Sequence, residues 1–171
     1  MRDVLTAMVQ PAYTLLAQSI SQDRDSNAIS LFHVIERVAL WVPAEGDQVV
    51  PNHPDAASTF RGAVVSVWIK GESDFGRTFQ YELALVPPGD NEQESIIGKL
   101  DVKFSDDRSK QLERIVIRLI GFPMLPKVSG IVWLESRIRK ASATNGDAAW
   151  VTQRYALPVD VNTGHPSTKS T

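Results

Sequence analysis

The feature of this sequence that most constrains its fold is an alternation of apolar and polar residues that recurs along the chain. In TFQYELAL, residues 78–85, phenylalanine, tyrosine and leucine occupy every second position. GKLDVKF (98–104) and ERIVIRLI (113–120) alternate in the same way. A period of two is typical of β-strands that have one buried face and one solvated face. Such strands are therefore expected to form the core of the protein.

Five further segments are rich in β-branched and aromatic residues, which also favour strands. They span residues 12–20, 30–42, 62–71, 129–138 and 150–159. Clusters of Gly, Pro, Asn, Asp and Ser separate the segments, and no long stretch has a helical period of 3.6. The pattern predicts an all-β protein with little helix, an antiparallel β-sandwich of about eight strands and of Ig-like or C2-like type.

Chain organisation and location follow from composition. We expect a single β-sandwich domain over residues 13–160, an N-terminal arm or short helix over 1–12, and a disordered tail over 161–171. No stretch approaches the roughly 20 apolar residues that span a bilayer, and the N-terminus is a poor match to a secretory signal. Cysteine is absent. These features predict a cytoplasmic protein without a membrane partner.

His33 and Glu36 have the spacing at which a helix presents two ligands to one metal ion. Their surroundings predict a strand, however, and residues i and i+3 of a strand point to opposite faces. No metal site is therefore expected there. Glu36 would fall in an apolar row with Val34 and Val38, where a lone carboxylate is costly. We expect a β-bulge near residues 35–37 to turn it outward.

Sequence motifs for several enzyme chemistries are missing. The chain has no P-loop, no G-x-S-x-G elbow, no G-x-G-x-x-G and no H-E-x-x-H. No cofactor and no hydrolytic triad are predicted. Calcium stays an open alternative, because aspartates at loop tips supply hard oxygen ligands. These aspartates are Asp23, Asp25, Asp106 and Asp107. Aspartate is equally common in turns for its own hydrogen bonding.

The charge of the chain is unevenly distributed. Residues 108–140 hold eight basic and two acidic residues, although the net charge of the chain is −2. If the strands at 113–120 and 130–140 pair across the connection between them, their outward rows form one surface. That surface would consist of Arg114, Arg118, Ile131, Trp133, Glu135, Arg137 and Arg139. Arginine and tryptophan are enriched at protein interfaces, so we predict an interface here.

Two stretches resemble a family of small bacterial β-sandwich proteins, a domain of unknown function. DRDSNAISLFHVIERV (23–38) resembles its opening turn and strand, and LIGFPMLPKVSGIVWLE (119–135) with RYALPV (154–159) resembles its closing elements. The resemblance extends over about residues 13–160. His33 stands where a glycine is common in that family. The resemblance implies a β-sandwich in a bacterial cytoplasm, and it implies no particular activity.

The sequence thus predicts a non-enzymatic protein-binding or assembly module. Its partner is expected to be a protein, either a different one or a second copy of this chain. Nucleic acid fits poorly, because the chain outside residues 108–140 is acidic and would repel phosphate. The alternative is an enzyme or a small-ligand-binding sandwich with its site near the long loop at 43–62, which contains His53 and three prolines.

Overall fold

The computed structural model describes residues 8–23, 29–42, 61–89, 93–121, 128–141 and 149–163. Nine strands and no helix occur in these residues. The strands are β1 (Gln10–Gln22), β2 (Ile29–Val34), β3 (Val38–Val42), β4 (Arg61–Ile69), β5 (Thr78–Val86), β6 (Ser95–Lys103), β7 (Leu112–Ile120), β8 (Gly130–Lys140) and β9 (Val151–Thr163). In this described part of the chain no helix could cross a membrane.

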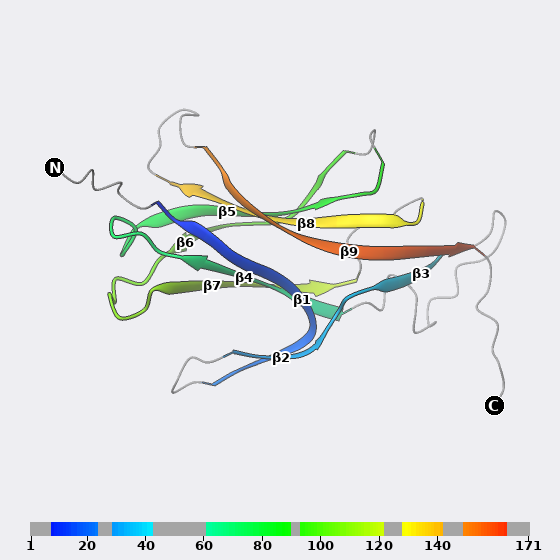
Figure 1. Cartoon of the computed structure of the whole chain (residues 1–171), viewed down its shortest axis with the longest axis horizontal. Helices are drawn as coiled ribbons and strands as arrows, with labels where there is room; N and C mark the ends of the chain where they lie inside the picture. Colours follow the sequence, from blue (N-terminus) through cyan, green and yellow to red (C-terminus); the bar gives the residue numbers. More distant parts are fainter. Residues whose placement is uncertain are drawn as a thin grey trace.

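Two sheets pack face to face (Figure 1). Sheet A has the strand order β2-β1-β4-β7, and sheet B has the order β3-β9-β8-β5-β6. The predicted all-β, two-sheet architecture is confirmed. Neighbouring strands are antiparallel except β3 and β9, which are parallel, so sheet B is mixed rather than purely antiparallel. The first strand begins at Gln10, inside the range expected for an arm, and residues 1–7 and 164–171 lie outside the described residues.

The run at 30–42 forms two strands rather than one, which accounts for the ninth strand. β2 belongs to sheet A and β3 to sheet B, so residues 35–37 carry the chain from one sheet to the other. The N–H of Ile35 donates to the carbonyl of Leu16 at 2.8 Å, and the Tyr155 hydroxyl donates to the Ile35 carbonyl at 2.6 Å. Glu36 is exposed, as expected. The cause is the break between β2 and β3, and not the β-bulge that the sequence predicted.

His33 has a φ angle of 53°, in the left-handed region that non-glycine residues rarely adopt. It lies next to the end of β2, just before the chain leaves sheet A. Glycine adopts this conformation without steric cost. A glycine at position 33 would therefore accommodate this backbone conformation without strain.

The core lies between the sheets and includes most of the side chains that the alternation assigned to it. The rings of Phe79 and Phe104 stack with centroids 4.3 Å apart. Predicted core residues that are buried are Phe79, Tyr81, Leu83, Leu85, Phe104, Ile115, Leu119, Val132 and Leu134. Val102 and Ile117 are half-buried. Leu100 is the exception, with 37% of its surface exposed, because β6 is the last strand of sheet B.

Four hydroxyl groups form a buried network across the core. Ser66 of β4 bonds the Tyr81 hydroxyl of β5 at 3.0 Å, and Tyr81 bonds Ser136 of β8 at 3.1 Å. Ser66 also bonds Ser136 and accepts a long bond of 3.4 Å from Thr14 of β1. Burial raises the pKa of Tyr81, partly offset by the two serine bonds. Because an unpartnered buried hydroxyl costs about 1–3 kcal/mol, the network favours this alignment of the two sheets.

Gly130, the first residue of β8, touches the turn that follows β5. A Cβ at this position would lie 2.6 Å from the Cβ of Pro88, closer than real contacts allow. We expect Gly130→Ala to lower the free energy of unfolding by about 1–3 kcal/mol through this overlap. At Gly98 a Cβ would meet Leu83 and Ile117 atoms at ordinary distances of 3.5–3.6 Å, so Gly98→Ala is the matched control. Urea unfolding checks both variants, and equal losses would contradict the steric explanation.

Candidate functional site

The residues predicted to form one interface lie on two different sheets. Arg114 and Arg118 are on β7, which pairs with β4 in sheet A. The other five are on β8, which pairs with β5 and β9 in sheet B, and they are Ile131, Trp133, Glu135, Arg137 and Arg139. The predicted pairing of β7 with β8 is therefore wrong. The connection at 121–129 joins the two sheets instead of closing a hairpin.

The five β8 residues do share the outer face of sheet B, because Val132, Leu134, Ser136 and Ile138 between them are buried. One end of this face is apolar. Trp133, which is half-buried, stands between Val86 and Ala156, and the exposed Ile131 stands beside Pro158. Ile96 of β6 is also exposed and stands opposite Ala84. Sequence reasoning did not identify Ile96, because its place beside β5 depends on the strand pairing.

The middle of the face carries a chain of ion pairs that joins β6, β5 and β8. Lys99 Nζ lies 2.9 Å from Glu82 Oε1, and Arg137 Nε lies 3.8 Å from Glu82 Oε2. Arg137 continues to Glu94, with Nη2 to Oε1 at 2.7 Å. Pairs on adjacent strands support one another's side-chain geometry. Glu82 therefore lies between two cations.

Arginine side chains cover the aromatic residues on the same face. Arg154 of β9 bonds Glu135 at 2.6 Å, and its guanidinium lies 5.9 Å from the ring centre of Trp133. Arg139 donates to Gln80 at 2.9 Å and lies 4.4 Å from the ring centre of Trp150. Cations over aromatic faces are attracted by the ring electrons. Arg154 and Arg139 thus each contact both a polar group and a tryptophan ring.

In the Lys99–Glu82 and Arg154–Glu135 ion pairs, the carboxylate is much more buried than the cation. The Glu82 and Glu135 side chains are 9% exposed, whereas their partners Lys99 and Arg154 are 63% and 58% exposed. The carboxylates lie at the base of the face and the cations above them. A molecule that approaches this face therefore meets positive charge before negative charge, although the pairs are neutral in sum.

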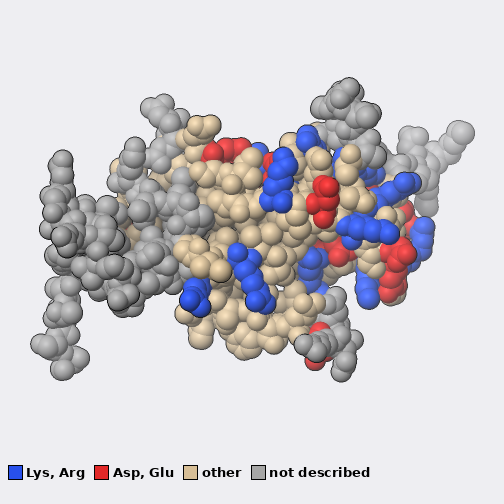
Figure 2. Space-filling view, turned by 180° about the vertical axis from the view of Figure 1, so that it is seen from behind, with Lys and Arg blue, Asp and Glu red and all other residues tan. Residues whose placement is uncertain are grey.

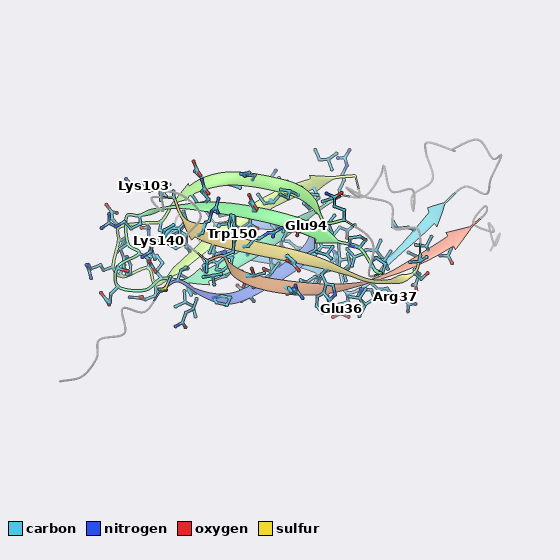
Figure 3. All side chains as sticks on the ribbon, turned by 90° about the horizontal axis from the view of Figure 1, so that it is seen from above. Glu36, Arg37, Glu94, Lys103, Lys140 and Trp150 are labelled. Atoms are coloured by element: carbon cyan, nitrogen blue, oxygen red, sulfur yellow. The ribbon has the colours of Figure 1, made fainter. Side chains whose placement is uncertain are left out.

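Toward one end of the sandwich lie Lys103, Lys140 and Trp150, while Glu36 and Arg37 lie toward the other (Figure 3). A cavity of about 670 Å³ opens beside Lys140, lined also by Ser73, Gly76, Arg77, Thr78 and Ala141. Lys140 Nζ lies 3.0 Å from a carboxylate oxygen of the fully buried Asp74. That carboxylate neutralises Lys140, while Arg77 is a second cationic residue of the lining.

Charged turns occupy the same end of the molecule. Blue and red side chains lie side by side there (Figure 2), where the β4–β5 and β6–β7 connections meet. Arg108 of the second connection bonds Glu72 of the first at 2.8 Å. Both side chains are largely exposed, and such surface pairs contribute about 0–1 kcal/mol. This ion pair joins the two turns.

The residues that the sequence suggested as metal ligands do not gather into a metal site in the described part of the chain. His33 and Glu36 are both exposed. Asp107 accepts bonds from the N–H and hydroxyl of Ser109, and these bonds lower its pKa, which is the behaviour of a turn residue. Within the described ranges no group of three or more His, Asp or Glu side chains could hold a metal ion. Asp25 and loop residues 43–60, including His53, lie outside the described residues.

Arg37 and Asp160 form a further pair near the crossover, joining the end of that segment to β9. The bond raises the pKa of the Arg37 guanidinium and lowers the pKa of Asp160. Burial and the nearby Glu36 raise the pKa of Tyr155, whose hydroxyl bonds Ile35. These contacts fasten the crossover to β9, and they serve the fold rather than a ligand.

No family model and no curated protein matches the chain. Among solved structures, a similar chain is the superoxide reductase (neelaredoxin) from Ignicoccus hospitalis, with a TM-score of 0.31 and 12% sequence identity. The match covers 88% of this chain and 82% of that chain. The fold and the surface described above therefore define the class only as a two-sheet β-protein.

Proposed function

We propose that this chain is a non-enzymatic protein-binding module that binds its partner through the outer face of sheet B. One observation carries the proposal, namely that buried carboxylates hold exposed cations beside an exposed apolar patch. Ile131, Trp133 and Ile96 supply the apolar area, and Lys99 with Arg154 supplies the outer charge. The complementary partner is a protein surface with an apolar centre and acidic residues around it.

Order in the free protein supports this assignment. Immobilising a long side chain on binding costs about 0.5–1.5 kcal/mol. On this face Arg154 and Lys99 are already paired with buried glutamates in the free protein. Binding would therefore immobilise these two side chains at a smaller entropic cost. Tryptophan and arginine are also the residue types that most often dominate binding energy. A nucleic acid partner is less suitable, because the chain outside residues 108–140 is acidic and would repel phosphate.

The strand order suggests a finer description of the fold. Within sheet B, the neighbouring strands β9, β8, β5 and β6 follow the same spatial order as strands G, F, C and C′ of immunoglobulin variable-type domains. This order favours the Ig-like type over the C2-like type. We also propose a cytoplasmic location, with which a chain that forms no disulfides is compatible.

The test removes the apolar patch without disturbing the core. The double variant Trp133→Ala/Ile131→Asp is expected to weaken partner binding by at least about 30-fold, the effect of losing 2 kcal/mol at a central contact. A partner recovered from the native host with the tagged wild-type chain is purified, and its affinity is measured by calorimetry. Arg118→Glu, on the opposite sheet, is the control and should leave the affinity unchanged. Equal binding by all three proteins would contradict the proposal.

A further inference from the structure

Strand β6 leaves one side of sheet B open. It is the last strand in the order, and within the described chain its only hydrogen-bonded neighbour is β5. An edge strand presents a row of unpaired N–H and C=O groups to any strand that can align with it. Lys99, Leu100, Asp101 and Lys103 are all exposed, so the second half of this edge is accessible.

An apolar seam runs along the same edge. Leu100 occupies an inward position opposite the buried Tyr81 and is nevertheless 37% exposed. Val102, also inward, and Ile117 of β7 in the other sheet are only half-buried. At Gly98 the two sheets are in close contact, since a Cβ there would lie 3.5 Å from the Ile117 side chain. Beyond Gly98, the side chains of Leu100 and Val102 are only partly covered.

The sequence of β6 complements itself in an antiparallel arrangement. With a two-fold axis through Leu100 and perpendicular to the sheet, Lys99 of one copy stands opposite Asp101 of the other, and the reverse pair forms as well. Leu100 meets Leu100, and Gly98 meets Val102. Opposite charges at directly facing positions stabilise a strand pair. Asp101 has no ion-pair partner among the described residues, so it is available for this contact.

Other alignments are less favourable. An axis through Asp101 places Asp101 opposite Asp101 and Lys99 opposite Lys103, and like charges that face each other are destabilising. An axis through Val102 pairs Asp101 with Lys103, but it leaves only residues 101–103 of the strand in register. The Leu100 axis uses Gly98 to Val102, all beyond the irregularity that interrupts the β5–β6 pairing near Gly98.

From the open edge, the apolar seam and the self-complementary charges, we propose that two copies of this chain associate through antiparallel pairing of β6 with β6. Sheet B then continues from one copy into the other. The paired Leu100 and Val102 side chains cover the seam of each sandwich. This inference does not depend on the binding role of the outer face, which stays exposed on the same side of both copies.

Charge reversal tests the register. Sedimentation velocity of the purified wild-type chain over a range of concentrations should show a monomer–dimer equilibrium. Lys99→Asp places aspartates opposite one another, and Asp101→Lys places lysines opposite one another. Because the two-fold axis applies each change twice, either variant should weaken dimerisation by at least about tenfold. Lys103→Asp makes the same charge change outside the facing pairs and should leave the dimer intact.

Mixing the two weakened variants gives the decisive result. A Lys99→Asp chain and an Asp101→Lys chain present opposite charges to each other, so the mixture should form a heterodimer with near wild-type affinity. Circular dichroism melts verify that each chain is folded, which matters because Lys99 also pairs with Glu82. The proposal is overturned if the wild type is monomeric at its highest soluble concentration. It is equally overturned if the reversals leave the dimer unchanged, or if the mixture does not associate.

Discussion

Replacing Leu83 with alanine is expected to lower the free energy of unfolding by about 2–5 kcal/mol, the range for large-to-small changes in a packed core. Leu83 lies in the middle of β5, between β8 and β6 of sheet B, and its surface is fully buried. Its neighbours at alternate positions, Tyr81 and Leu85, are buried too. Truncation removes apolar contacts and leaves a cavity that the surrounding strands cannot close.

Urea unfolding measures this loss, with Ile120→Ala as the control. Ile120 ends β7 and is 87% exposed, so its truncation should change the stability by less than about 0.5 kcal/mol. If Leu83→Ala unfolds at the same urea concentration as the wild type, the inward and outward faces of β5 are reversed from those described.

Strand faces could be predicted because the period of two is a local property. The alternation in TFQYELAL assigned Phe79, Tyr81, Leu83 and Leu85 to the core, and all four are buried. The same pattern assigned Leu100 to the core, where it is only partly covered. Whether a strand lies at the centre or at the edge of a sheet depends on its neighbours, and the local pattern carries no information on them.

The split between β2 and β3 shows the same limit. The run from residue 29 to 42 contains no turn signal. Both β2 and β3 have the apolar composition of sandwich strands, so the sequence reads as one continuous strand. The sign of an irregularity was Glu36 in an apolar row, where a lone carboxylate is costly. The sequence indicated an irregularity at 35–37, but the change of sheet needed the structure.

The candidate face was predictable in part for the same reason. Alternation placed Trp133, Glu135, Arg137 and Arg139 together, and they share one face of β8. Glu82 and Lys99 also held outward positions, but their pairing depends on which strands are neighbours. Arg114 was assigned to this surface because β7 and β8 are consecutive in sequence. Consecutive strands in a sandwich often lie in different sheets, as these two do.

Removing the carboxylate of Glu113 is expected to have the second large effect on stability. Its partner is Lys70, which follows β4 and whose side chain has no solvent exposure. The Lys70 ammonium lies 3.6 Å from a Glu113 oxygen, 3.2 Å from the carbonyl of Ser105 and 4.6 Å from the ring centre of Phe75. Glu113, which is 20% exposed, also accepts a bond from the Ser105 N–H at 2.9 Å.

Glu113→Ala leaves the buried ammonium without a counter-charge, which should cost about 3–5 kcal/mol. Replacing both partners removes the charge and its counter-charge together, so Lys70→Met/Glu113→Gln should be within about 1 kcal/mol of the wild type. In that double variant the side-chain carbonyl oxygen of the introduced glutamine can still accept from the Ser105 N–H, and methionine fills the apolar space of the lysine stem. Urea unfolding at neutral pH measures the single and double variants side by side. Equal losses in both would show that the pair stabilises the fold by packing and not by charge compensation.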